Sequence, residues 1–238
     1  MRRIMITNDD GIEASGIIRL AEASKKYGEV WVIAPRYQKS AASHSITLHS
    51  PIEVEEFDFP VEGVHAYAVY GTPGDCVRVG TLNIMPEKPD IIFSGINFGY
   101  NAGTDVQYSA TVGAAMEGAF QGIPSVAFSE GTNDGYIITD KYLDQMIQEA
   151  LTWDITNLQI LNINFPTCKE EEFAGILRER KVATTSVFND SYTCETLDNG
   201  RKAYMVHGEF EHEAALGTDL RALYDNHISI GVVKNIGY

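Results

Sequence analysis

Two adjacent carboxylates, Asp9 and Asp10, are the residues whose types and spacing point most directly to chemistry. They follow a short apolar run and precede Gly11. Adjacent carboxylates repel one another, and a hard divalent cation relieves that repulsion. The alternative is purely structural, with Asp10 capping a turn, Gly11 supplying a positive φ and Asp9 solvated. Taken alone, the motif favours the structural interpretation, so the neighbouring loops must decide.

A second polar loop, residues 34–47, is dense in hydroxyl groups and carries one imidazole. In this loop Ser40 could be an oxygen ligand of a cation or a contact to an anion, and His44 could donate a proton to a leaving group. The alternative is a polar surface loop whose serines bond to their own backbone.

A third polar segment, residues 94–105, contains three glycines and two asparagines. The side-chain carbonyl of Asn97 is a suitable neutral donor for Mg²⁺ or Mn²⁺. Ser109 and Thr111 follow at the start of a predicted helix, where free backbone N–H groups can bind a phosphate. The alternative is an ordinary helix N-cap at one of these two residues.

The elements that must position these loops alternate between strand and helix. Strands are predicted at residues 3–7, 30–34, 52–55, 64–69, 91–94, 125–129 and 159–164, and helices at 16–27, 72–83, 111–121 and 140–153. This order predicts an α/β fold, a parallel sheet with helices on both faces. The three polar loops follow strands and must converge at one edge of that sheet, which favours a metal and phosphate site.

The chain divides near Pro166 in this interpretation. Residues 1–166 form the catalytic domain, with inserted strands at about 50–70. Residues 167–238 are predicted to be a β-rich extension, with strands at 182–187, 203–206 and 227–233 and no strong crossover helix. Exposed strand edges in such an extension are often covered by a second subunit, so we expect it to serve oligomerisation.

Composition excludes several classes of protein. The formal net charge of −15 argues against a nucleic acid polymer as partner, because such binding needs clustered Lys and Arg. No apolar run approaches the roughly 20 residues that cross a bilayer, so no membrane contact is expected and the expected location is cytoplasmic. Three cysteines without CxxC spacing are expected to be reduced thiols. The glycine-rich dinucleotide fingerprint is absent.

These segments resemble, in order and spacing, the SurE (survival protein E) family of 5′/3′-nucleotidases. The resemblance covers the first half of the chain almost continuously and is thin beyond Pro166. The matching stretches are TNDDGIEASGI, VIAPRYQKSAASHSIT, YGTPGDCV, IIFSGINFGYNAGTDVQYSATVGAAMEG, GIPSVAFS, LNINFP and GTDL.

The resemblance implies a Rossmann-like, mostly parallel sheet with a C-terminal β-hairpin extension, assembled as a homodimer or homotetramer. It also implies that the protein hydrolyses nucleoside 5′- and 3′-monophosphates with one Mn²⁺ or Mg²⁺ per subunit, and short polyphosphate is a further candidate substrate. By matching position, the implied metal ligands are Asp9, Asp10, Ser40 and Asn97. The residues implied to line the phosphate pocket are Asn8, Ser43, Ser45, Asn101, Ser109 and Thr111.

Two residues near the implied site depart from the family pattern. Ala110 and Ser43 each stand where the family usually has glycine. If Ala110 required a positive φ, its side chain would strain the loop by roughly 1 kcal/mol. These departures leave the reaction type intact and bear on substrate preference and turnover.

Our mechanistic hypothesis gives the cation the task of neutralising a phosphate oxygen and lowering the pKa of the attacking water. Helix N–H groups near Thr111, together with Ser109, would stabilise the growing charge, and His44 would protonate the leaving oxygen. Two alternatives remain open. Asp9 could be a nucleophile that forms an aspartyl-phosphate, or the chain could be a nucleotide-binding sensor without turnover.

Overall fold

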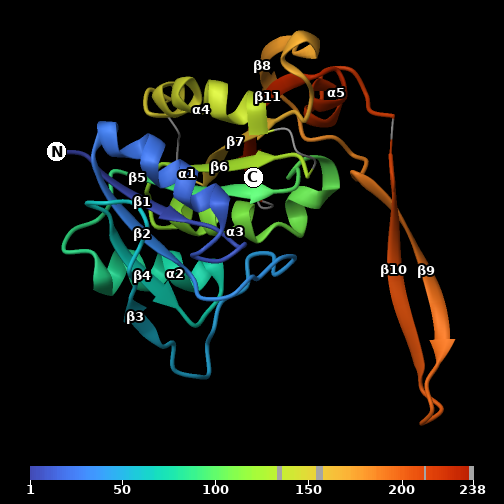
Figure 1. The fold of residues 1–238 in the computed structure, drawn as a ribbon, viewed down its shortest axis with the longest axis horizontal. Coiled ribbons are helices and arrows are strands. Elements are labelled where there is room, and N and C mark those ends of the chain that lie inside the picture. Colours follow the sequence, from blue (N-terminus) through green and yellow to red (C-terminus); the bar gives the residue numbers. More distant parts are fainter. Residues whose placement is uncertain (133–135, 154–157, 212, 236–238) are drawn as a thin grey trace.

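The structure, a computed structural model, describes residues 1–132, 136–153, 158–211 and 213–235. A nine-stranded sheet with the order β3-β4-β2-β1-β5-β6-β7-β11-β8 runs through its centre (Figure 1). The six strands from β4 to β7 in this order are parallel. Their bounds are β1 (Arg3–Thr7), β2 (Glu29–Pro35), β4 (His65–Val69), β5 (Ile91–Phe98), β6 (Ser125–Glu130) and β7 (Gln159–Phe165).

The flanking strands break the parallel pattern. On one edge β3 (Val54–Glu56) pairs antiparallel with β4. On the other side β11 (His227–Lys234) pairs antiparallel with β7, and β8 (Gly175–Arg180) pairs parallel with β11. The central strands are buried almost throughout, which explains why their sequences are continuously apolar.

Helices cover both faces of the sheet. On one face α1 (Ser15–Ser24) packs beside α4 (Tyr136–Ala150), and on the other α2 (Pro73–Val79) packs beside α3 (Ala110–Phe120) (Figure 1). A π-helical turn (Gly80–Ile84) continues α2. This arrangement confirms the predicted α/β class, and none of the helices in the described ranges is long and apolar enough to cross a membrane.

A long hairpin extends away from the body of the molecule (Figure 1). It consists of β9 (Phe188–Thr196) and β10 (Lys202–Phe210), which pair antiparallel along their whole length and form a sheet of their own. The predicted strand at 203–206 lies inside β10. The C-terminal hairpin implied by the family resemblance is therefore present.

The strand predicted at residues 182–187 is wrong, because this segment is irregular. Its apolar side chains Ala183 and Val187 pack against Leu220 of a short helix, α5 (Asp219–Tyr224), instead of alternating across a sheet. The backbone N–H of Ala183 donates to Asp219 Oδ1 over 2.9 Å and so is not available for a strand ladder. Strands β8 and β9 and helix α5 were not predicted from the sequence.

The segment after Pro166 contributes to both sheets. Strands β8 and β11 join the central sheet, whereas β9 and β10 form the separate hairpin. The division of the chain into domains at residue 166 stays a prediction.

Candidate functional site

The polar loops meet at the edge formed by the carboxyl ends of the parallel strands. Asp9 and Asp10 follow β1 directly, and residues 36–47 follow β2. Backbone hydrogen bonds join these two loops: the N–H of Lys39 donates to the carbonyl of Asp9 over 2.7 Å, and that of Ile12 to Pro35 over 2.9 Å. The structure thus brings together the first two candidate segments.

Asp9 is a buried carboxylate held by one hydroxyl. Only 4% of the residue is exposed, and Thr111 Oγ1 donates to its Oδ1 over 2.5 Å. Burial raises the pKa of Asp9 to about 6; the hydrogen bond from Thr111 opposes this shift and the charge of Asp10 adds to it. Asp9 is therefore ionised at neutral pH at a cost in free energy, and a cation would remove that cost.

Asp10 connects the second loop with the third. Its Oδ2 accepts a hydrogen bond from the N–H of Phe98 over 3.0 Å. Gln38 Nε2 donates to both Asp10 Oδ1 and Ser40 Oγ, over 3.4 and 3.0 Å, which places these two oxygens around one donor. Burial raises the pKa of Asp10 as well, although the hydrogen bonds from Phe98 and Gln38 oppose the rise.

Asn97 presents a carbonyl oxygen of fixed orientation. Its Nδ2 donates to the carbonyl of Gly99 over 2.7 Å, so the amide is anchored by its nitrogen and Oδ1 is left for another partner. The residue is buried near the end of β5, next to the Phe98 amide that holds Asp10.

The four predicted metal ligands therefore come from adjoining segments and offer only oxygen atoms, the donor set that Mg²⁺ and Mn²⁺ prefer. Burial raises the pKa of both carboxylates, and no Lys or Arg is among the groups that shift either one. In the described ranges no three His, Cys, Asp or Glu side chains gather around one point, so a cation at Asp9 and Asp10 would need neutral oxygens such as those of Ser40 and Asn97. The residues present fit a hard divalent ion.

The N-terminus of α3 lies beside Asp9, as the bond from Thr111 requires. Ser109 is the N-cap, and its Oγ accepts from the N–H of Val112 over 3.0 Å. The amides of Ala110 and Thr111 precede the first intrahelical hydrogen bond, so neither has a partner within the helix, and both residues are fully buried. Ala110 is the first residue of α3 and has no positive φ. The backbone strain that a positive φ would cause at an alanine in place of glycine is therefore absent at this position.

Ser43 adopts the conformation that favours glycine. Its φ of 52° lies in the left-handed region, which costs a non-glycine residue about 1 kcal/mol. The N–H of Ser43 donates to the carbonyl of Tyr108 over 3.0 Å. A Cβ at Gly113 would lie 2.6 Å from the carbonyl oxygen of Ser43, so the loop rests directly on the first turn of α3.

His44 faces a carboxylate that the sequence analysis did not single out. Its Nε2 lies 2.8 Å from Glu117 Oε2, and Arg78 Nη1 lies 3.1 Å from the other oxygen of Glu117. Burial alone would raise the pKa of Glu117, but the hydrogen bond and charge of His44, together with the charge of Arg78, lower it. The sequence does carry a signal here, because Glu117 is the one charged residue in the helix Ala110–Phe120.

Asp75 was also missed, although it holds the end of the second loop. It accepts from the N–H and Oγ1 of Thr47 over 2.8 and 2.7 Å, and from the N–H of Thr72 over 2.9 Å. Thr72 and Asp75 form a capping box at the start of α2. That motif is visible in the sequence, but its bond to a loop 28 residues away is not.

The remaining candidates hold backbone in place. Asn8 is fully buried and donates to the carbonyl of Gly11 over 2.8 Å. Asn101 is buried, donates through Nδ2 to Ser129 Oγ and is held by Asn164. Ser45 is exposed, and its carbonyl accepts from Thr72. Within the described ranges none of these three residues forms a hydrogen bond with Asp9 or Asp10, so their contact with a substrate stays a prediction.

Fold and site together define an α/β protein with a cluster of oxygen donors at the carboxyl ends of its parallel strands, beside a helix N-terminus. A family model described as survival protein SurE matches residues 4–190. The 5′-nucleotidase SurE of Clostridium botulinum (strain ATCC 19397 / Type A) is 40% identical over 231 residues, 95% of this chain and 90% of that protein.

A second relative, the 5′-nucleotidase SurE of Pelobacter propionicus, is 41% identical over 235 residues, 95% of this chain and 91% of that protein. The crystal structure of the SurE protein from Aquifex aeolicus superimposes with a TM-score of 0.82 at 33% identity, covering 98% of this chain and 93% of that one. The chain belongs to the SurE family.

Removal of the buried charge of Asp9 is predicted to stabilise the metal-free protein. Most substitutions that remove a side-chain interaction destabilise a protein instead. In the metal-free protein the pKa of Asp9 is raised from 3.8 to about 6, so the folded state holds this proton more tightly than the unfolded chain. That contribution to stability is fully present below about pH 4 and is lost as the pH rises through about 6. We therefore expect Asp9→Asn to be more stable than the wild type at pH 8, by roughly 1–3 kcal/mol, and similar to it at pH 4.

Urea unfolding of chelator-treated protein at the two pH values measures this difference. Asp58→Asn, which removes an exposed carboxylate, serves as the control and should change the free energy of unfolding by no more than about 0.5 kcal/mol. An Asp9→Asn variant that is less stable than the wild type at pH 8 contradicts the prediction.

Proposed function

We propose that this protein is a metal-dependent phosphomonoesterase that hydrolyses nucleoside monophosphates. The observation that carries the proposal is the meeting of two carboxylates, the buried Asp9 and the half-buried Asp10, with the N-terminus of α3. A cation and a phosphate are the ligands that such a pair of features accommodates side by side. The names of the relatives, 5′-nucleotidase SurE, support nucleotides as the substrate class.

Asp9, Asp10, Ser40 and Asn97 would hold the metal ion, Mn²⁺ or Mg²⁺. A divalent ion bound there supplies positive charge for the phosphate and makes water a stronger nucleophile at neutral pH. Thr111 ties Asp9 to α3 over 2.5 Å, so the carboxylate that holds the ion and the helix that receives the phosphate move as one unit.

The N-terminus of α3 would bind the phosphate oxygens. The amides of Ala110 and Thr111 point out of the helix start, where the helix dipole favours negative charge. Ser109 caps the helix through its hydroxyl, so its contribution is to fix the orientation of these amides. Donors placed before the reaction stabilise the charge that grows on phosphorus-bound oxygens in the transition state.

His44 would donate a proton to the leaving oxygen of the ribose. Its Nε2 is engaged with Glu117, which leaves Nδ1 as the atom that can reach a ligand. A carboxylate on the opposite nitrogen fixes the orientation of the ring, as in other catalytic carboxylate–histidine pairs. Glu117 is in this proposal a positioning residue.

Metal dependence is tested by phosphate release from metal-stripped protein on a panel of nucleoside 5′- and 3′-monophosphates and short polyphosphate. We expect release to be restored by Mn²⁺ or Mg²⁺ and to fall by at least about 100-fold in Asp9→Asn, with the fold retained by circular dichroism. Nucleotide binding without release under any metal contradicts an enzyme and supports a sensor instead.

The acid role of His44 predicts a dependence on the leaving group. His44→Gln should lower kcat for a nucleoside monophosphate by about 100-fold, because the ribose alkoxide needs a proton as it leaves. Turnover of p-nitrophenyl phosphate, whose leaving group is stable as an anion, should change much less. His49→Gln, in an exposed part of the same loop region, is the matched control; equal loss on both substrates rejects the acid role.

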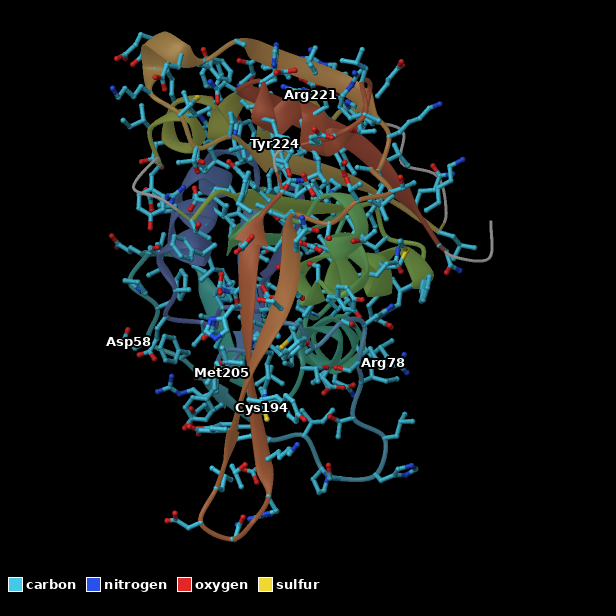
Figure 2. The ribbon with its side chains drawn as sticks, turned by 90° about the vertical axis from the view of Figure 1, so that its right-hand side faces the viewer. Asp58, Arg78, Cys194, Met205, Arg221 and Tyr224 are labelled. Atoms are coloured by element: carbon cyan, nitrogen blue, oxygen red, sulfur yellow. The ribbon has the colours of Figure 1, made fainter. Side chains whose placement is uncertain are left out.

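Oligomerisation through the hairpin follows from its exposed apolar surface. Tyr204 and Met205 of β10 are 63% and 65% exposed, and a two-stranded hairpin standing alone is marginally stable in water. Figure 2 shows Met205 and Cys194 on the two strands of the hairpin, and Figure 1 shows that these strands extend away from the body. We infer that a second copy of the chain covers this hairpin, giving a homodimer or homotetramer.

Met205→Glu tests this inference. A charge placed in a buried interface is costly, so the variant should shift the mass measured by light scattering from an oligomer towards the monomer. Glu62→Lys, at an exposed and charged position outside the hairpin, should leave the mass unchanged. A wild-type protein that is monomeric at micromolar concentration rejects the inference.

A further inference from the structure

We propose that the ion pair between Arg19 and Glu130 holds the loops of the candidate metal ligands in register, which makes both residues positioning residues for that site. The pair joins α1 to the end of β6, across 111 positions of the chain. Arg19 Nη1 donates to Glu130 Oε1 over 2.9 Å, and Nη2 donates to Oε2 over 2.8 Å. Two parallel bonds of this kind fix orientation as well as distance. The inference rests on the proposed metal-dependent function.

Helix α1 connects the pair with the loop that carries Asp10. The helix begins shortly after that residue, and its first turn lies directly on β5, because a Cβ at Gly16 would lie 2.0 Å from the carbonyl oxygen of Ile96. Arg19 lies about one turn further along the same face of the helix. The helix is therefore held at two points, and it cannot turn about the contact at Gly16 without breaking the bonds to Glu130.

The backbone of Glu130 connects the pair with the segment that carries Asn97. Its carbonyl accepts a hydrogen bond from the N–H of Gly99 over 2.8 Å. The carbonyl of Gly99 in turn accepts from Asn97 Nδ2 over 2.7 Å, and the N–H of Phe98 donates to Asp10 Oδ2 over 3.0 Å. The end of β5 thus transmits the position of Glu130 to two of the predicted metal ligands.

Asp10 needs this support because a cavity of about 300 Å³ adjoins it, and Glu130 borders the same cavity. A carboxylate beside such a space is not fixed by packing on that side. Hydrogen bonds hold it instead, and the bond from Phe98, at 3.0 Å, is shorter than the bond of 3.4 Å from Gln38. A small movement of the end of β5 would therefore displace the Asp10 carboxylate.

The guanidinium of Arg19 is itself held by two residues of α4. Its Nε lies 3.0 Å from Asp140 Oδ1, and its central carbon lies 4.7 Å from the centroid of the Tyr136 ring. A planar cation that has contacts along its edge and over its face keeps little freedom of movement. The pair consequently provides a fixed reference point for the loops.

The buried position of Glu130 determines how the pair must be tested. The residue is 3% exposed; burial raises its pKa to about 7, the charge of Arg19 opposes the rise, and the charges of Asp140 and Asp10 add to it. Removal of one partner would leave a buried group unpaired and destabilise the protein, whereas apolar residues in place of both are often tolerated. The informative variant therefore replaces both residues.

Arg19→Met/Glu130→Leu removes one charge of each sign, so the net charge near Asp10 is unchanged. We expect the Kd for Mn²⁺, measured by calorimetry on chelator-treated protein, to rise roughly 10- to 100-fold, the usual effect of losing a residue that orients a metal ligand. The variant should unfold at nearly the same urea concentration as the wild type. Turnover of a nucleoside monophosphate at saturating Mn²⁺ should stay within about threefold of the wild type, because the ligands themselves are retained. A merely structural pair predicts the reverse, a lower urea midpoint and an unchanged Kd.

The matched control is a second bidentate pair of the same residue types. Arg178 of β8 donates to both oxygens of Glu149 of α4, over 2.5 and 2.6 Å, and neither residue is bonded to a segment that carries a predicted metal ligand. Arg178→Met/Glu149→Leu should change the Kd for Mn²⁺ by less than about twofold. A wild-type Kd in Arg19→Met/Glu130→Leu, or an equal rise in both double variants, overturns the proposal.

A conservative substitution decides the matter if the double variant does not fold. Arg19→Lys keeps a positive charge beside Glu130 but replaces two parallel hydrogen bonds by the contact of a point charge. Loss of one charge-assisted bond should still raise the Kd for Mn²⁺ by at least about threefold. An unchanged Kd in this variant also overturns the proposal.

Amide exchange in the metal-free protein gives a readout that depends on neither metal nor turnover. The N–H groups of Phe98 and Gly99 should exchange at least about 10-fold faster in Arg19→Met/Glu130→Leu than in the wild type, because both lie on the segment that the pair holds. Unchanged exchange overturns the positioning role. If the wild type binds neither Mn²⁺ nor Mg²⁺, the proposed function fails and the exchange rates alone decide this role. If the wild type binds Mn²⁺ and the double variant binds it equally well, the metal site stands and the positioning role is overturned.

Discussion

The buried carboxylate of Asp9 is the constraint on which the rest of the site depends. Its removal from water disfavours the charged form, and the single hydroxyl of Thr111 opposes only part of this effect. A group in this state attracts either a proton or a cation. The site therefore stores unfavourable electrostatic free energy that the proposed divalent ion would release on binding, and the surrounding loops must be rigid enough to preserve that state.

That rigidity comes from contacts outside the site itself. Asp75 fixes the far end of the second loop through Thr47, and Glu117 fixes His44 on α3. Asn162 and Asn164 both donate to the carbonyl of Asn101, which anchors the third segment on β7. Each of the three loops is thus tied to a neighbouring helix or strand by buried or half-buried polar side chains, whose bonds are strong because water is excluded.

Most of the central fold could be predicted from the sequence, because continuous apolar runs and helical periodicity are local signals. The polar residues at the strand ends of β1 and β5 were recognisable for the same reason. The sequence could not show that Glu117 faces His44 or that Asp75 meets Thr47, since these contacts join residues 73 and 28 positions apart. The strand predicted at 182–187 failed because Ala183 and Val187 are apolar for packing against α5, a tertiary demand that a local pattern cannot distinguish from a strand.

The place of β11 in the sheet determines the order in which the fold can be completed. In the series β7-β11-β8, the strand that comes after β8 in the chain lies between β8 and β7. During synthesis β8 consequently has no neighbour in the sheet until residues 227–234 have been made, and the edge of β7 stays open for as long. The parallel core can form early, whereas the pairing of β11 with β7 and β8 must wait for the end of the chain. Contacts between residues distant in sequence slow folding. A nascent chain interrupted before β11 would carry an unpaired edge, the kind of surface that recruits chaperones or a second unfinished chain.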